Sequence, residues 1–259
     1  MEIIKVVLLG IIQGLTEFLP VSSSGHLVLF QSLFGIESDQ LTLEVFLHFG
    51  TLLPIIIIFR KDIIDIILFK KEKRQLTWLI IIGMIPTGLI GFFLKDFFAG
   101  LYSSVSLVGF MLLITGLLLY LAERLGHNRK SLAEMNGVNA GLIGIAQGIA
   151  IIPGISRSGI TIVAALLQGL DRESAARYSF LLSIPVIFGA GLLETKDVLA
   201  SGLEGLSWLM LAAGTTAAAI SGYFAIKYLL HILKKGRLSI FSYYCWTIGL
   251  LILLLAGLF

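Results

Sequence analysis

Apolar residues in this chain form long continuous runs, and two of these runs are interrupted by short polar stretches. Runs such as 53–59 and 248–255 do not alternate between apolar and polar residues, which excludes the alternating segments of about ten residues typical of transmembrane β-strands. Continuous runs of spanning length predict transmembrane α-helices. In each half of the chain, one broken run is followed by three continuous runs. We expect the first set at 3–34, 43–59, 77–94 and 105–122, and the second at 138–169, 175–193, 207–226 and 239–258.

The two halves also match residue by residue, which predicts a duplicated unit. An ordered series of matches along both halves is much less expected by chance than a single match. We therefore expect one membrane domain over 1–259, built from repeat halves 1–126 and 135–259. With a shift of 134, Gly10 matches Gly144, Gln13 matches Gln147, Gly14 matches Gly148, Ser22 matches Ser156, Ser24 matches Ser158, and Gly25 matches Gly159.

Each broken run is predicted to be a re-entrant helix hairpin that returns to its own side of the bilayer. Pro20 stops a helix, and the serines after it offer caps for the next one. Three crossings in each unit would make the two units inverted relative to each other, with six spanning helices in total. Broken backbone at membrane depth survives only where it is buried in protein or lines a watery cavity. The two breaks are therefore expected to line the working site.

The charges between the runs support this arrangement and predict an orientation. The chain is 57% apolar and 14% charged, with a mean hydropathy of +0.98, and no cleavable signal peptide is evident at its start. Lys5, Lys95 and Lys196 fall on one predicted face, whereas fifteen Lys or Arg residues, many within 60–74, fall on the other. The positive-inside rule makes the second face cytoplasmic and both termini external. The single cysteine, Cys245, cannot form an internal disulfide and is interpreted as a core residue.

The first break carries an acid, three serines and a histidine. Gln13 and Glu17 are four residues apart and share a helix face. A carboxylate in a membrane segment is expensive and predicts function, although pairing with a buried arginine is an alternative. Ser22, Ser23, Ser24 and Gly25 would present hydroxyls and backbone N–H groups at a helix start, where anions bind; helix capping explains one serine well but three less well. His26 could be a core histidine, but its neighbours favour catalysis.

The second break, Pro153-Gly-Ile-Ser-Arg-Ser-Gly-Ile-Thr161, adds positive charge. Arg157 stands between Ser156 and Ser158, and its planar guanidinium could hold two phosphate oxygens. Gly159 leaves room for close approach, and Thr161 adds a hydroxyl. An acid, a histidine, an arginine and a serine-rich helix start together indicate phosphate chemistry better than any one of them alone.

The motifs Gln13-Gly-Leu-Thr-Glu-Phe-Leu-Pro-Val-Ser-Ser-Ser-Gly-His26 and Pro153 to Thr161 closely resemble those of the undecaprenyl pyrophosphate phosphatases of bacteria, also called bacitracin resistance proteins. The resemblance extends over the whole chain. It implies a hydrolase of the inner membrane that converts undecaprenyl pyrophosphate to undecaprenyl phosphate and recycles this carrier for cell-wall synthesis. It also implies six spanning helices, two re-entrant pairs and a divalent cation, Mg2+ or Ca2+.

The resemblance assigns the family's acid to Glu17, its serines to Ser22 and Ser23, its histidine to His26, and its arginine motif to Ser156, Arg157, Ser158 and Thr161. The family has Glu or Gln at the position of Gln13. With Gln there, Glu17 would hold the ion with pyrophosphate oxygens and water.

From these residues we expect Arg157 and the Ser22 to Gly25 amides to clamp the terminal phosphate. Glu17 would be metal ligand or general base, Ser23 nucleophile, and His26 proton donor or alternative nucleophile; direct attack by water stays open. The competing interpretation is an inverted-repeat transporter or flippase for a phosphorylated lipid or an anion, which would need the same residues without the chemistry. We expect the lipid substrate and membrane lipids as partners and no nucleic acid, and leave open whether the protein forms a homodimer.

Overall fold

The computed structural model describes residues 2–36, 41–94, 97–98, 100–101, 104–126, 130–201 and 206–256. Lys95 and Arg129, two of the basic residues in the charge pattern, lie outside these ranges, and the Lys196 side chain is likewise not described. The described chain is helical, and its one isolated bridge pairs Lys130 with Leu170. The α-helices are α1 (Ile3–Phe18), α2 (Ser23–Leu33), α3 (Leu41–Ile58), α4 (Arg60–Ile67), α5 (Arg74–Phe93), α7 (Val105–Leu125), α8 (Gly137–Ile149), α9 (Arg157–Leu167), α10 (Arg172–Ser201), α11 (Trp208–Lys234) and α12 (Ser239–Ala256), with 3-10 turns η1 (Lys71–Lys73) and η2 (Leu132–Glu134).

The helices follow the predicted order of broken and continuous runs. Among the described residues, five helices are long and apolar enough to cross a membrane: α3, α5, α7, α10 and α11. The apolar stretch Ser239–Leu255 of α12 falls just short of that length. The prediction of an all-helical, polytopic membrane protein is therefore confirmed. The amphipathic α4 was not expected, because its charged residues break the apolar pattern after Ile58.

Both predicted breaks separate two short helices. The α1 helix ends at Phe18, and Ser22 caps α2 by accepting a hydrogen bond from Gly25 N at 3.3 Å. Ser22 does so with a φ of 68°, a left-handed conformation that non-glycine residues rarely adopt and that is enriched at functional sites. In the second pair, Ser156 caps α9 by accepting from Gly159 N at 3.1 Å. One serine therefore acts as the cap in each pair.

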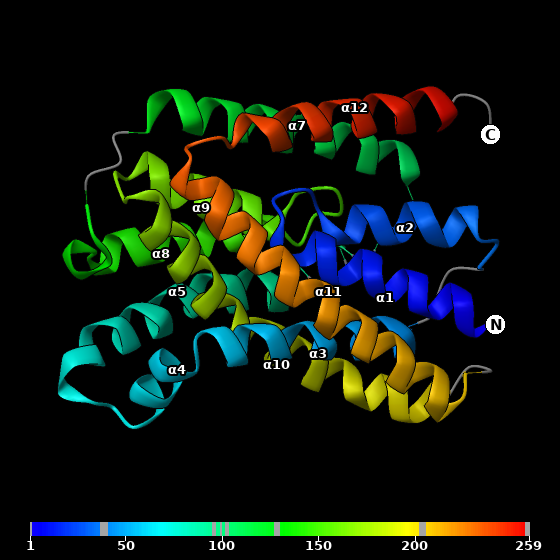
Figure 1. Cartoon of the computed structure of the whole chain (residues 1–259), viewed down its shortest axis with the longest axis horizontal. Coiled ribbons are helices and arrows are strands. Elements are labelled where there is room, and N and C mark those ends of the chain that lie inside the picture. The colour runs from blue at the N-terminus through cyan, green and yellow to red at the C-terminus, as the bar shows by residue number, and fades with distance from the viewer. Residues whose placement is uncertain are drawn as a thin grey trace.

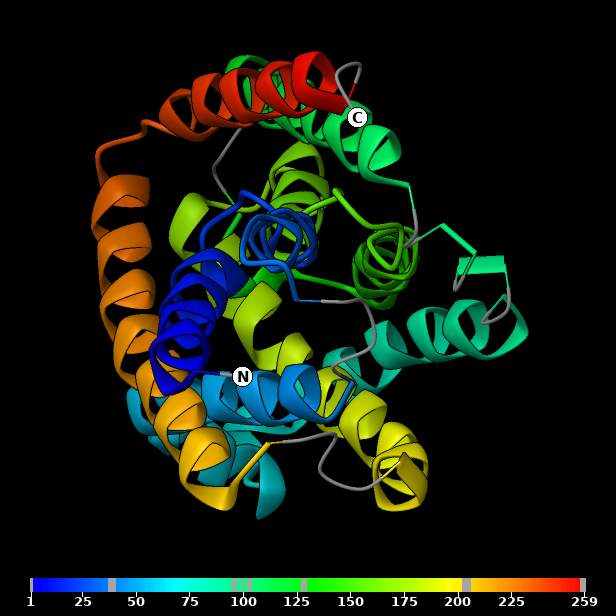
Figure 2. The ribbon, with the colours of Figure 1, turned by 90° about the vertical axis from the view of Figure 1, so that its right-hand side faces the viewer.

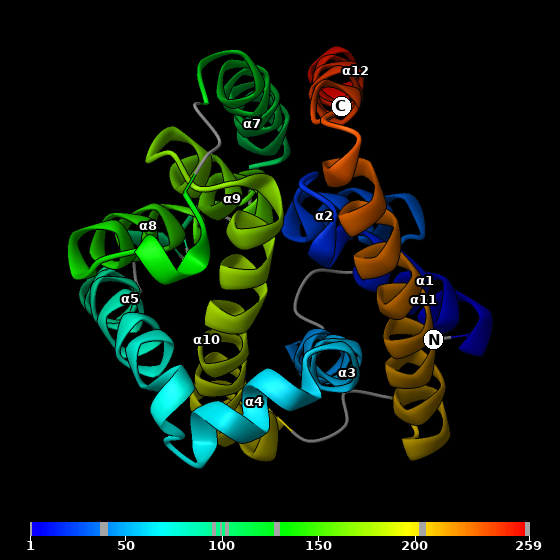
Figure 3. The same ribbon diagram turned by 60° about the vertical axis from the view of Figure 1, so that its left-hand side comes forward.

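The longer helices surround the two short pairs. Figure 3 shows α1, α2, α3 and α11 on one side and α5, α8, α9 and α10 on the other, with α7 and α12 lying together above both groups. The α1 helix packs along α11, and α8 packs along α5, so each short pair contacts a long helix from the other half of the chain. Figure 2 shows α2 and α9 near the centre, between the α7–α12 pair and α3.

Small residues allow the closest of these helix contacts, as is usual between membrane helices. A Cβ atom added to Gly249 of α12 would lie 2.7 Å from the carbonyl oxygen of Gly109 on α7, and one added to Gly109 would lie 3.0 Å from that of Gly249. Large apolar side chains instead cover the outside: Phe92, Leu193 and Leu254 are each more than 70% exposed. A surface of this kind suits contact with lipid chains.

The start of α1 and the end of α12 lie at one end of the molecule, and α4 and the turn after it lie at the opposite end (Figure 1). At that opposite end, Asp62 of α4 links three elements. Its carboxylate accepts a hydrogen bond from Arg177 Nε of α10 at 2.9 Å and lies 2.8 Å from Lys73 Nζ of η1. Burial alone would raise the pKa of Asp62, but the hydrogen bonds and charges of Arg177 and Lys73 together lower it.

Asp62→Asn is expected to lower the free energy of unfolding by about 1.5–3 kcal/mol at neutral pH, because it removes charged hydrogen bonds at a largely buried carboxylate. A lowered pKa stabilises the folded state above the unfolded-state pKa of about 4, and this contribution is lost as the pH falls through the folded-state pKa. The difference from the parent should therefore shrink on acidification, which thermal unfolding in detergent at several pH values measures.

Asp65→Asn is the matched control, because Asp65 lies on the same helix but pairs with the half-exposed Lys70 at 2.6 Å. It should change stability little, since exposed ion pairs contribute little. A difference between the parent and Asp62→Asn that persists undiminished at about pH 2 would contradict this account of the cluster.

Candidate active site

The loops of the two short helix pairs touch, which brings the two sequence motifs together. Ser158 Oγ donates to the carbonyl oxygen of Leu19 at 3.0 Å. A Cβ atom added to Gly25 would lie 3.5 Å from Gly154 Cα, so the two loops meet at glycines. Thr115 of α7 fixes the second loop, since its Oγ1 donates to Gly154 O at 3.1 Å and accepts from Ser156 N at 3.2 Å. Thr115 was not predicted from the sequence.

Glu17 lies at the centre of this junction and is 6% exposed. Its Oε1 accepts a hydrogen bond from Arg157 Nη2 at 2.7 Å across 140 residues of sequence. Its Oε2 accepts from Ser23 Oγ at 2.6 Å and from Gln13 Nε2 at 3.0 Å. The predicted shared face of Gln13 and Glu17 is thus confirmed. The alternative in which Glu17 pairs with an arginine is also realised, and that arginine belongs to the same site.

Arg157 retains donors for a further partner. Its Nη1 is buried and has no hydrogen-bond partner among the described residues, although Nη2 is bound to Glu17. A buried guanidinium donor left unpaired is costly unless a ligand satisfies it. Arg157 is also the first residue of α9, where the helix start favours negative charge. The arrangement therefore suits a phosphate oxygen.

Other predicted residues have structural partners. Ser24 lies against Ser22 (Oγ to Oγ, 3.3 Å), and the Gly25 and Gly159 amides are bound by the two caps. The amides of Ser23 and Ser24 lie in the first turn of α2, where N–H groups have no acceptor within the helix. These two amides are therefore the ones available to an anion. Thr161 is fully buried; it donates to Arg157 O at 2.8 Å and shares a hydrogen bond with Ser179 of α10 at 2.6 Å. Thr161 therefore orients the start of α9.

His26 is held from both ring nitrogens. Nδ1 lies 2.7 Å from the carbonyl oxygen of Ser22, which can only accept, so Nδ1 carries the proton. Nε2 then accepts from the hydroxyl of Tyr244 on α12 at 2.7 Å, and the two rings are stacked with centroids 5.6 Å apart. Tyr244 was not predicted, because it follows His26 by 218 residues inside an apolar run.

His48 also approaches the site and was not predicted to do so. It lies on α3, its Nδ1 is 2.8 Å from the carbonyl oxygen of Glu44, and its Nε2 is 3.8 Å from Glu17 Oε2. The available signal was an ionisable residue inside the predicted span 43–59, which by itself indicates function but not contact with the first motif.

The site offers a limited set of ligands to a divalent cation. Across the part of the chain that the structure describes, no three His, Cys, Asp or Glu side chains gather as a metal cluster. Glu17 provides a carboxylate, and Gln13 Oε1 is a buried acceptor without a hydrogen-bond partner among the described residues. Two oxygens of this kind fit an ion that takes its other ligands from substrate and water.

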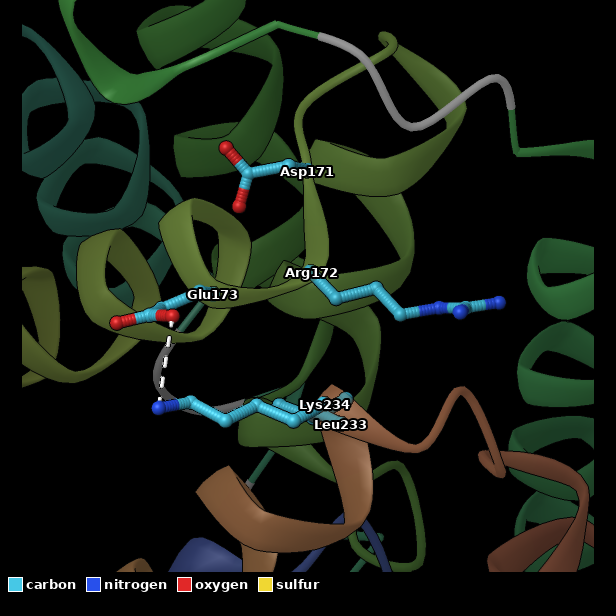
Figure 4. Close-up of a pocket in the computed structure, with 5 residues that line it drawn as sticks. All are labelled: Asp171, Arg172, Glu173, Leu233 and Lys234. Carbon is cyan, nitrogen blue, oxygen red and sulfur yellow. Dashed lines mark ion pairs between the residues drawn. The ribbon is translucent and has the colours of Figure 1, made fainter.

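A separate pocket, located where α10 begins and α11 ends, contains none of these residues. It is lined by Asp171, Arg172, Glu173, Leu233 and Lys234 (Figure 4). Glu173 and Lys234 face each other across it at 3.9 Å, and both are 66% exposed. Exposed pairs of this kind contribute little. Arg172 Nε is buried without a hydrogen-bond partner among the described residues, but the two acids that line the pocket, Asp171 and Glu173, would repel a phosphate. The pocket is a poor candidate for phosphate chemistry.

The fold and the site together define a multi-pass membrane protein with a buried cluster of an arginine, a carboxylate and a serine. A family model described as "Bacitracin resistance protein BacA" matches residues 6–251, and the chain therefore belongs to that family. A protein of Halothermothrix orenii named undecaprenyl-diphosphatase is 68% identical over 259 residues, which cover all of both chains. Proteins of the same name from Carboxydothermus hydrogenoformans and Alkaliphilus metalliredigens are 50% and 45% identical, each match covering 98% of both chains.

Proposed function

We propose that this protein hydrolyses undecaprenyl pyrophosphate to undecaprenyl phosphate and inorganic phosphate, and thereby recycles the lipid carrier and confers resistance to bacitracin. Family membership and relatives named for this activity support the reaction. The observation that carries it in the structure is the buried Arg157 Nη1, which has no hydrogen-bond partner in the described chain and lies beside a serine bound to a carboxylate.

In the proposed reaction, Arg157 and the first-turn amides of α2 bind the oxygens of the terminal phosphate. Ser23 Oγ attacks its phosphorus while the hydroxyl proton passes to Glu17 Oε2, which already accepts it at 2.6 Å. The bond from phosphorus to the bridging oxygen breaks, and undecaprenyl phosphate leaves. Water then attacks the phosphoserine, the bond from phosphorus to Ser23 Oγ breaks, Ser23 Oγ takes back the proton held by Glu17, and phosphate is released. The direct hydrogen bond from Ser23 Oγ to Glu17 Oε2 supports this route over direct attack by water.

His26 is proposed to act as a proton donor only after Nε2 has taken up a proton, because in the described conformation Nε2 carries none and accepts a hydrogen bond from the Tyr244 hydroxyl. In the described conformation both ring nitrogens are engaged, so the Tyr244 hydroxyl holds the ring in place until substrate binds. Gln13 and Glu17 would hold the divalent cation, Mg2+ or Ca2+. When bound, the ion neutralises charge on the pyrophosphate.

Release of inorganic phosphate from undecaprenyl pyrophosphate by the purified protein in detergent tests the function. Release that depends on a divalent cation is expected. The alternative, a transporter or flippase, predicts binding or movement of the lipid with no phosphate released, because a carrier leaves the phosphoanhydride intact. No release with any of several divalent cations would therefore overturn the phosphatase.

We further propose six spanning helices in two inverted repeats, with α12 as the sixth span, in a bacterial inner membrane with both termini on the outer face. The α1 helix of the first half packs against α11 of the second half, and α8 of the second half packs against α5 of the first. This reciprocal packing supports a two-fold symmetry between the repeats. Placement of the chain ends opposite the basic segment around α4 and η1 supports the orientation (Figure 1). The exposed apolar helices would accept the prenyl tail sideways from the bilayer.

In a variant with Cys245 replaced by Ser, a cysteine at Ser201 should react with an impermeant thiol reagent added outside intact cells, and a cysteine at Lys71 should not. The two positions lie on opposite predicted faces, which the basic residues distinguish. Labelling after the cells are opened is the control, since both cysteines should then react. The reverse pattern in intact cells would overturn the orientation.

A further inference from the structure

His48 on α3 has one ring nitrogen bound to its own helix and the other facing Glu17. Its Nδ1 lies 2.8 Å from the backbone carbonyl oxygen of Glu44. A carbonyl oxygen only accepts, so Nδ1 carries the proton and Nε2 of the neutral ring has a free lone pair. Histidines that bind metals almost always donate their other ring N–H to a carbonyl or carboxylate in this way, which fixes the tautomer and the ring orientation.

The free nitrogen faces the carboxylate proposed to hold the cation. His48 Nε2 and Glu17 Oε2 are 3.8 Å apart, which is too long for a hydrogen bond. Two ligand atoms that each lie about 2.1 Å from one ion are separated by roughly 3 to 4 Å, depending on the angle between the bonds. The observed separation therefore suits an ion between them. The His48 side chain is 35% exposed, so water and substrate oxygens can reach the same point.

We propose that His48 Nε2 joins Glu17 Oε2 and Gln13 Oε1 in binding the divalent cation, and that pyrophosphate oxygens and water complete the coordination. This inference rests on the proposed phosphatase function. The ion would displace the Gln13 Nε2 donor from Glu17 Oε2, while Ser23 keeps its hydrogen bond to the same oxygen. With a neutral Gln13 in the site, the imidazole supplies a ligand that a second carboxylate would otherwise supply.

An imidazole ligand has a consequence for ion selectivity. Oxygen ligands suit Mg2+ and Ca2+, whereas nitrogen ligands favour later transition-metal ions such as Co2+. The site should therefore bind Co2+ more tightly relative to Mg2+ than a site of oxygen ligands alone would. The ratio of these two affinities reports on His48 without reference to turnover.

The experiment titrates Co2+ into the purified full-length protein in detergent, without substrate, and follows the visible absorption of the ion. The protein is purified with a tag that contains no histidine. Mg2+ affinity is obtained by displacement of Co2+. The variants are His48→Gln, Glu17→Gln and, as matched control, His231→Gln, which alters an exposed histidine of α11. Thermal unfolding confirms that each variant is folded.

His48→Gln should weaken Co2+ binding at least about tenfold, the lower end of the effect of disturbing a metal-ligand shell. Mg2+ binding should weaken much less, so the affinity ratio falls, while His231→Gln matches the parent. Glu17→Gln should weaken the binding of both ions. A Co2+ to Mg2+ ratio in His48→Gln equal to that of His231→Gln would overturn the inference and leave His48 as an ion-pair partner of Glu17. Phosphate release by the parent protein is measured separately, so failure of the phosphatase function would be seen independently.

Discussion

Arg157→Lys is expected to lower phosphate release per folded molecule by about 100-fold or more, the size of effect seen when one preorganised donor to a developing charge is lost. Lysine keeps the charge but not the planar fork of donors. In the protein, one arm of that fork orients Glu17 and the other, Nη1, is left for the substrate. A single ammonium group on a flexible stem cannot occupy both positions at once. Phosphate release by purified variants, corrected for the folded fraction, measures the effect.

Arg177→Lys is the matched control for this substitution. It also removes a planar guanidinium that binds a carboxylate, Asp62, but it does so at the α4 end of the molecule. It should change stability and leave turnover of the folded protein close to that of the parent. Turnover by Arg157→Lys within about twofold of the parent, a difference of about 0.4 kcal/mol in barrier height, would contradict the phosphate clamp.

Ser23→Ala is expected to lower phosphate release by more than about 10³-fold, because the removal of a nucleophile eliminates a step that no ion concentration restores. The structure removes the main competing explanation, loss of a helix cap. Ser22, and not Ser23, caps α2, and the Ser23 hydroxyl instead donates to Glu17. Ser23→Ala should therefore leave the folded protein nearly as stable as the parent, which thermal unfolding in detergent checks.

Ser104→Ala controls for the effect of capping. Ser104 caps α7 by accepting from Leu107 N at 3.3 Å, away from the site, and its loss should cost about 0.5–2 kcal/mol of stability with little change in turnover. Near-normal phosphate release by folded Ser23→Ala would eliminate Ser23 as the nucleophile. The reaction would then proceed through His26 or by direct attack of a water molecule.

Local sequence determined the helices and half of the site. Apolar runs place helices because a bilayer forces every backbone polar group to bond within its own segment. Spacing along one helix or across one break is equally local, so the shared face of Gln13 and Glu17 and the proximity of Ser23 to Glu17 followed from the chain itself. The serine cap of α2 followed as well, although which serine acts as the cap depended on the backbone of Ser22.

Tertiary structure decided which distant groups meet. Glu17 and Arg157 were both expected in one site, but their direct bond depends on how the two short helix pairs pack. His48 and Tyr244 reach the site from α3 and α12, and nothing in their spacing along the sequence places either residue beside Glu17 or His26. Thr161 matched the motif, yet packing against Ser179 makes it a support for α9. Spacing along the sequence constrains neighbours on one helix, whereas contacts between helices depend on crossing angles and rotations that packing of the whole molecule sets.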